Sequence, residues 1–168
     1  MNERKTIYKW FWVWEFEKEE RWLNEMALSG WALAGVGFCK YVFERCEPGE
    51  YVIRLEMHGA DSAYISFMEE LGAQLVRRYF QWLYFRRAAD KGPFDIFSDI
   101  DSRISHLDRI ARVLKFIGLA NLLIGSLNAF SYSRAGIANL LCATLLMYGL
   151  GRIQGKKEAL EKDRQLRE

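Results

Sequence analysis

Residues 116–133 read FIGLANLLIGSLNAFSYS, residues 135–151 read AGIANLLCATLLMYGLG, and neither run contains a charged side chain. A helix of either length would be roughly 26 Å long, close to the 30 Å hydrocarbon core of a bilayer. Core helices of soluble proteins normally keep a polar stripe, which these two runs almost completely lack. The sequence therefore predicts a transmembrane helical hairpin over residues 116–151, with Arg134 in its turn. A buried helical hairpin in a soluble core is the alternative.

Basic residues flank this hairpin and set its expected orientation. They are Arg103, Arg109, Arg112 and Lys115 before the first run, and Arg152, Lys156, Lys157, Lys162, Arg164 and Arg167 after the second. The turn carries only Arg134. Because positively charged flanks stay in the cytoplasm, we expect a two-pass protein of the inner (cytoplasmic) membrane with both termini cytoplasmic.

Strand-like and helix-like segments alternate upstream of the hairpin in the order βαββ, then βαββ again. Aromatic and β-branched residues predict strands, including one over 6–14, and Gly30 and Gly72 are typical helix stops. A shift of 42 residues superimposes the two halves, 6–46 and 51–88. We expect an α+β fold in which tandem βαββ units form an antiparallel sheet with helices on one face. Chance similarity of two units, or one ferredoxin-like unit with extra strands, is the alternative.

These patterns divide the chain into four expected parts. Residues 1–92 form a cytoplasmic α+β domain, which ends at Lys91-Gly92-Pro93. Residues 93–115 form an amphipathic connector helix, 116–151 the transmembrane hairpin and 152–168 a charged cytoplasmic tail. The tail mixes both signs of charge at helical spacing, which is typical of a solvated helix end.

Alternation along the predicted strands assigns side chains to two faces of the sheet. The face under the helices is expected to carry Phe11, Val13, Tyr41, Phe43, Ile53, Leu55, Leu83 and Phe85. The opposite face is expected to carry Trp10, Trp12, Trp14, Arg54, Glu56, Trp82, Tyr84 and Arg86. Tryptophans on a sheet face indicate a contact surface. A protein partner, self-association, a small hydrophobic ligand or a membrane surface would each cover it, and so would the helix that follows residue 94.

Catalytic and metal-binding patterns do not stand out in the sequence. The two histidines, His58 and His106, lie in polar contexts without an HExxH motif, and the three cysteines form no CxxC pair. The 24 basic and 22 acidic residues are too evenly balanced for a typical nucleic-acid-binding protein. We therefore expect a non-enzymatic protein with no catalytic residues, no metal, no cofactor and no nucleic-acid partner.

Three segments carry a resemblance to a known family. They are KWFWVWEFEKEERWLNEMALSGWALAGVGF (9–38), KYVFERCEPGEYVIRLEM (40–57) and YISFMEELGAQLVRRYFQWLYFRR (64–87). With the basic helix and hairpin that follow, they resemble the bacterial membrane-associated domain of unknown function family 2812, over about residues 6–155. The resemblance implies no activity. It does imply a genomic neighbourhood of PadR-type transcriptional regulators, and hence a link to membrane or envelope stress control.

The expected function follows from the contact surface and this resemblance together. We expect the cytoplasmic domain to be a sensing or protein-interaction module that acts with a PadR-type regulator. The tandem βαββ order also looks like the GyrI-like effector-binding modules, which implies a ligand between two repeats. A membrane-anchored module that binds small hydrophobic or cationic molecules is therefore the alternative function.

Overall fold

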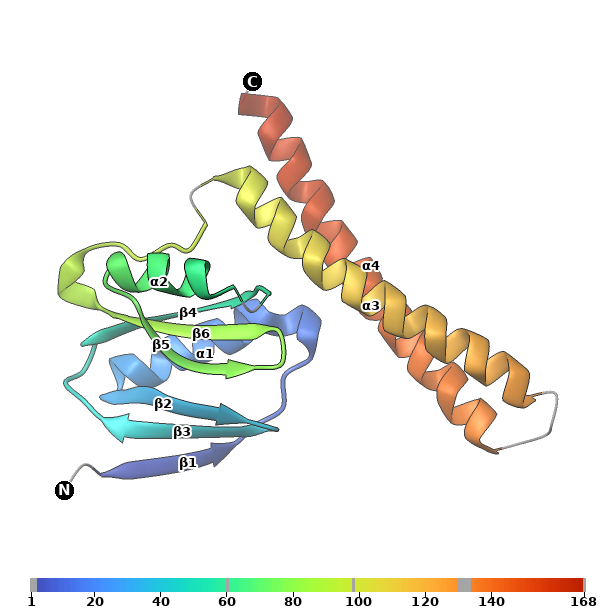
Figure 1. Ribbon diagram of the computed structural model, residues 1–168, viewed down its shortest axis with the longest axis horizontal. Helices are drawn as coiled ribbons and strands as arrows, with labels where there is room; N and C mark the ends of the chain where they lie inside the picture. Colours follow the sequence, from blue (N-terminus) through green and yellow to red (C-terminus); the bar gives the residue numbers. More distant parts are fainter. Residues whose placement is uncertain (1–2, 60, 98, 130–133, 168) are drawn as a thin grey trace. The chain divides into compact units, whose positions relative to one another are not determined.

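Two three-stranded antiparallel sheets form the framework of the N-terminal part of the chain in the computed structural model (Figure 1). The structure describes residues 3–59, 61–97, 99–129 and 134–167. It divides into a first unit, Met1–Ser98, and a second unit, Asp99–Glu168. The α+β class predicted from the sequence is confirmed, but the six strands form two sheets and not one.

The first unit repeats one arrangement of strands. The first sheet has the order β1-β3-β2 and the second the order β4-β6-β5, and β2 lies beside β5. The strands are β1 (Arg4–Tyr8), β2 (Trp31–Gly37), β3 (Lys40–Arg45), β4 (Tyr51–Met57), β5 (Gln74–Tyr79) and β6 (Trp82–Ala88). The helices are η1 (Val13–Glu15), α1 (Phe16–Leu28), α2 (Ser62–Glu70) and η2 (Ala89–Lys91).

Backbone details confirm that the two halves are equivalent. Gly30 and Gly72 lie 42 residues apart, and each has a φ of 81° where a helix turns into a strand. Glycine adopts this left-handed conformation without the strain that a Cβ would cause. The pairing register also shifts at equivalent points, between Leu33 and Gly35 and between Leu75 and Arg77. The repeat is therefore present in the fold as well as in the sequence.

The strand predicted over residues 6–14 is wrong in its second half. β1 ends at Tyr8, and the chain then leaves the sheet and forms η1 at Val13–Glu15. The Glu15 N–H donates to the Trp12 carbonyl, which closes this turn. Tryptophans raise strand propensity because they pack well on a pleated surface, but here they pack on one another, so tertiary contacts decide the local structure.

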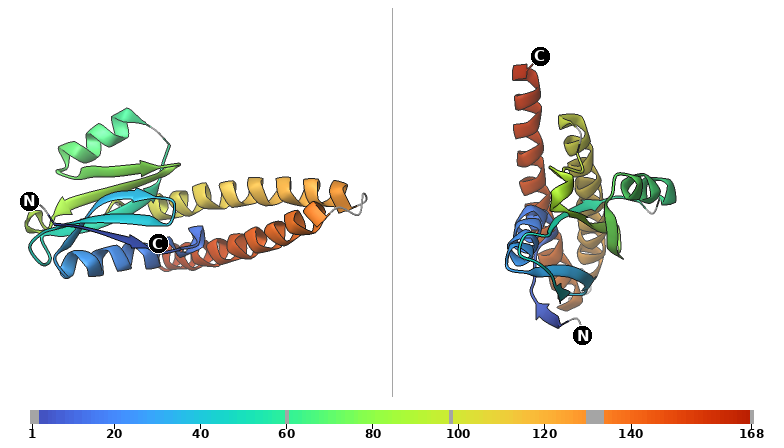
Figure 2. Two further views of the ribbon diagram at one scale, coloured as in Figure 1. Left: turned by 90° about the horizontal axis from the view of Figure 1, so that it is seen from below. Right: turned by 90° about the vertical axis from the view of Figure 1, so that its left-hand side faces the viewer.

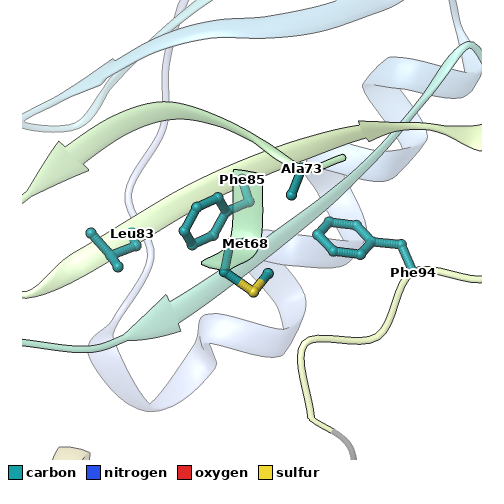
Figure 3. Close-up of a cluster of buried hydrophobic side chains, with 5 residues drawn as sticks. All are labelled: Met68, Ala73, Leu83, Phe85 and Phe94. Carbon is teal, nitrogen blue, oxygen red and sulfur yellow. The ribbon is translucent and has the colours of Figure 1, made fainter. Parts of the chain in front are cut away.

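The core of the first unit is built from buried side chains of both sheets. Figure 3 shows Met68 of α2 packed with Leu83 and Phe85 of β6, together with Ala73 and Phe94. Six of the eight residues predicted to lie under the helices are buried: Tyr41, Phe43, Ile53, Leu55, Leu83 and Phe85. Phe11 is half-buried and Val13 is exposed, because the strand that was expected to carry them ends before them.

Side chains of α1 complete the hydrogen bonds of an edge strand. β4 pairs with β6 on one side only, which leaves alternate backbone groups without a strand partner. The Asn24 amide donates to the Ile53 carbonyl at 2.8 Å and accepts from the Ile53 N–H at 2.9 Å. Glu20 accepts from the Leu55 N–H at 3.1 Å. These bonds occupy the middle of an edge that could otherwise pair with another chain.

Replacing Asn24 with alanine is expected to destabilise the first unit by about 1–3 kcal/mol, because the part-buried Ile53 backbone loses both partners. Hydrogen exchange of peptides from β4 should accelerate more than exchange in β3. Arg21→Ala, at an exposed position of the same helix, is the matched control and should change stability by less than about 0.5 kcal/mol. Equal exchange in the two variants would show that Asn24 does not protect this edge.

The second unit consists of two long antiparallel helices, α3 (Ile100–Ala129) and α4 (Arg134–Arg167). They approach closely at small residues, as the sequence predicted. A Cβ added to Gly136 would lie 2.8 Å from the backbone nitrogen of Ala129, and one added to Gly125 would lie 3.0 Å from the Leu140 side chain. Only glycine allows such an approach without displacing the partner helix.

The charged halves of these helices are also paired. α3 begins at Ile100, later than the connector helix predicted over 93–115, and runs without a break into the first apolar run. α4 continues from the second apolar run through the expected tail. Lys157 of α4 lies 2.7 Å from Asp108 of α3, and Arg164 lies 2.8 Å from Asp101. The segment expected to be a solvated helix end is helical, and it also forms ion pairs with α3.

Candidate functional site

The structure places the eight predicted contact residues in three environments. Trp10 and Trp12 are exposed, whereas Arg54, Trp82 and Arg86 are half-buried and Trp14, Glu56 and Tyr84 are buried. They do not form one continuous sheet face.

The pairing register explains why the predicted face is wrong. Ile53 lies opposite Arg86 and Leu55 opposite Tyr84, so these four side chains share one face of the second sheet. Sequence alternation had placed Ile53 and Leu55 on the face of Leu83 and Phe85. A register that differs by one residue moves every side chain of a strand to the other face.

Both faces of the second sheet are covered within the first unit. α2 packs on the face that carries Leu83 and Phe85, where the Tyr64 hydroxyl donates to Glu56. α1 lies on the other side, where Tyr84 reaches Glu19. The prediction of helices on one face is therefore also wrong for this sheet, and Glu56 and Tyr84 belong to the interior.

A buried carboxylate joins the two sheets. Glu19 of α1 accepts hydrogen bonds from the hydroxyls of Tyr41 on β3 and Tyr84 on β6, each at 2.8 Å and both at Oε1. Burial raises the pKa of Glu19, and the two tyrosine hydrogen bonds oppose this shift without cancelling it. The pKa values of both tyrosines are also raised, chiefly by burial and then by the neighbouring carboxylate.

Glu19 is not among the contact residues predicted from the sequence. The helical spacing contains the signal, because Glu19 shares the buried stripe of α1 with Phe16, Leu23 and Ala27. A carboxylate in such a stripe requires partners from neighbouring elements. Here the partners come from both repeats, so the cluster fixes one repeat against the other.

Arg86 also connects the repeats. Its guanidinium donates to the Glu44 carboxylate and, at 3.2 Å, to the Leu33 carbonyl, while its Nε donates to Gln74 at 2.8 Å. Glu44 and Arg86 occupy equivalent positions of the 42-residue repeat. These contacts give Arg86 a structural role between the sheets.

Exposed aromatic side chains gather at one end of the first unit. The Trp12 ring stacks on Trp14 at 5.0 Å, Trp10 meets Trp12 edge-on at 5.2 Å, and Phe38 meets Trp10 at 5.9 Å. Phe38 and Phe80 occupy the turns of the β2–β3 and β5–β6 hairpins, which lie at the same end of the unit in both Figure 1 and Figure 2. We call Tyr8, Trp10, Trp12, Phe38 and Phe80 the aromatic end.

The aromatic end is built from other parts of the chain than the predicted contact face. Its members are 37–79% exposed and come from turns and from the segment after β1, not from the middle of strands. Alternation along strands could identify Trp10 and Trp12 but not Phe38 and Phe80, because hairpin turns lie outside the strand pattern. The aromatic end is the best candidate contact surface of the first unit.

The described residues contain no group of three or more histidine, cysteine or acidic side chains that could hold a metal ion. Cys39 and Cys46 are half-buried and Cys142 is exposed, all as free thiols. His106, which the sequence placed in a polar context, is buried on α3.

Two βαββ repeats followed by two helices that are long and apolar enough to cross a membrane define a class of α+β protein with candidate membrane spans. The chain belongs to the family described as "Protein of unknown function (DUF2812)", whose model matches residues 15–119. The match begins at the last residue of η1, after β1, and runs through the rest of the first repeat and the whole second repeat into α3. No curated protein and no solved structure matches the chain.

Proposed function

We propose that the protein is a non-enzymatic sensing or interaction module held at the cytoplasmic face of the inner membrane. The α3–α4 hairpin is the anchor, and the first unit presents the aromatic end as its contact surface. The first unit transmits its bound or unbound state to a transcriptional regulator of the PadR type. The observation that carries the proposal is the apolar outer surface of the hairpin.

That outer surface suits lipid better than water. In the most apolar windows of α3 and α4, only 28% and 22% of the residues are buried. The exposed large apolar side chains include Phe116, Ile117, Leu119, Leu122, Leu123, Ile124, Leu127, Ile137, Leu141, Leu145 and Tyr148. A core helix of a soluble protein would have most of this surface covered, and an exposed apolar area of this kind indicates contact with a membrane or a partner.

Labelling with a membrane-impermeant maleimide tests the location and orientation. In a Cys142→Ser background, we expect Cys39 and Cys46 to react only after cell lysis, because positive flanks keep the first unit in the cytoplasm. A cysteine introduced as Ala135→Cys, at an exposed position beside the turn, should react in intact cells once Cys39 and Cys46 are replaced by serine. Protection of that cysteine in intact cells, with labelling after lysis, would contradict the orientation.

The buried Glu19 cluster supports a second function, the binding of small hydrophobic cations. The Glu19 carboxylate accepts from two tyrosine hydroxyls, and a carboxylate next to aromatic side chains can pair with an organic cation. Fluorescence titration with tetraphenylphosphonium tests this, with Glu19→Gln expected to abolish saturable binding. Such binding, together with the absence of a regulator in pull-downs from native membranes, would replace the first proposal. A regulator recovered without cation binding would support it.

A further inference from the structure

We propose that the aromatic end docks on the anionic lipid surface of the membrane that holds α3 and α4. This inference rests on the membrane attachment in the proposed function and names what the first unit binds. The occupant is the headgroup region of the bilayer, with Phe38 and Phe80 inserted at its acyl boundary.

The composition and shape of the aromatic end fit a membrane interface. Tyrosine and tryptophan concentrate at this depth, where an apolar ring and a polar N–H or O–H are both satisfied. Tyr8, Trp10 and Trp12 supply such rings, while Phe38 and Phe80 are 73% and 79% exposed at the hairpin turns. Phe80 has a φ of 52°, a left-handed conformation that is uncommon for a bulky residue. Projecting rings on two turns can enter a fluid surface, whereas a rigid partner would need matching pockets.

The charges around the aromatic end favour an anionic surface. Lys9 lies between Tyr8 and Trp10 in the chain, Lys40 pairs with Tyr8 across the first sheet, and Arg78 donates to the Phe80 carbonyl at 3.3 Å. Glu15 forms an ion pair with Lys18, and Asp61 caps α2 by accepting from the Ala63 N–H. The excess of basic side chains is complementary to phosphatidylglycerol and other anionic headgroups.

Tethering makes weak docking effective. Residues 100–115 of α3 span about 24 Å before the first apolar run begins. The first unit is tethered to the bilayer through α3, so docking is intramolecular and needs little intrinsic affinity. Binding of a free soluble partner would be intermolecular and would gain nothing from this tether.

Tryptophan fluorescence can test the docking in the full chain. All six tryptophans lie in the first unit, at positions 10, 12, 14, 22, 31 and 82, and α3 and α4 contain none. The full chain is placed in nanodiscs of brominated phosphatidylcholine, with or without phosphatidylglycerol. Bromine quenches tryptophan only at short range, so we expect clear quenching in the anionic discs and at least twofold less in the zwitterionic ones.

Variants of the two turns separate docking from other causes of quenching. Phe38→Ser with Phe80→Ser leaves every tryptophan in place and should lower the ratio of docked to undocked protein about tenfold, because both inserted rings are lost. Leu28→Ser, which replaces a 67% exposed leucine at the C-terminal end of α1, is the control and should not change quenching.

The outcomes are distinguishable. Quenching that requires phosphatidylglycerol and both phenylalanines supports the proposal. Protein that stays in the discs without quenching, or whose quenching ignores the double variant, overturns it while the membrane attachment stands. In that case, cross-linking of a protein through a photoreactive residue at Trp12 would assign the aromatic end to a protein partner. Failure of the chain to enter the discs would overturn the attachment itself, and the docking with it.

Discussion

Replacement of Glu19 by alanine is expected to destabilise the first unit by about 3–5 kcal/mol, because two buried tyrosine hydroxyls lose their acceptor and a cavity remains. Tyr41 and Tyr84 come from different sheets, so the loss also loosens the contact between the repeats. The measurement is denaturant unfolding of the full chain followed by tryptophan fluorescence, which reports on the first unit alone.

Glu19→Gln separates the hydrogen bonds from the charge. Both tyrosines donate to the same oxygen of Glu19, so a glutamine amide oxygen can accept both bonds while the buried charge is removed. Its stability near neutral pH should lie within about 1 kcal/mol of the unchanged chain. Similar losses of stability in the alanine and glutamine variants would mean that the charge of Glu19, and not its hydrogen bonds, holds the sheets together.

The unchanged chain and the Glu19→Gln variant should differ in how their stability depends on pH. Burial raises the pKa of Glu19 above its ordinary value of 4.5, so the folded chain binds this proton more tightly than the unfolded chain. Protonation of Glu19 therefore adds stability as the pH falls through the raised pKa towards 4.5, and this gain is absent above it. The unchanged chain should gain stability in that range relative to Glu19→Gln. A constant difference across the range would contradict a raised pKa.

Local signals in the sequence were enough to predict the repeat. Gly30 and Gly72 each end a helix, as predicted, and they have the same left-handed φ. Such a helix stop depends on a few adjacent residues, so it can be recognised without knowledge of the rest of the fold. The apolar runs were equally clear, because helix length and the lack of charge depend on composition alone.

The contact face could not be predicted because it depends on pairing between distant strands. β4 and β6 are separated by α2 and β5, and nothing local fixes whether Ile53 lies opposite Arg86 or one residue away. That single choice decides whether Tyr84 faces α1 or solvent. Glu19 and Tyr84 are likewise brought together across much of the unit, so their hydrogen bond has no counterpart in the sequence pattern.

Introduction of aspartate at Leu123 and Leu141 together is expected to remove the chain from the membrane fraction. Each residue lies near the middle of an apolar run, on the exposed side of its helix, at 65% and 66% exposure. An aspartate at the centre of a spanning helix costs about 2.5–3.5 kcal/mol, so the pair costs about 6 kcal/mol. Carbonate extraction followed by immunoblotting should then show the double variant in the soluble or degraded fraction.

Leu166→Asp is the matched control, because Leu166 is also exposed but lies in the charged half of α4 beyond the apolar run. It should remain in the membrane fraction. Lipid and water around Leu123 and Leu141 predict different effects of aspartate. If these side chains already face water, each aspartate changes the free energy of unfolding by less than about 0.5 kcal/mol. If the double variant folds, stays in the fraction of the unchanged chain and becomes more soluble, then α3 and α4 pack in water, and the exposed apolar surface must be covered by protein instead of lipid.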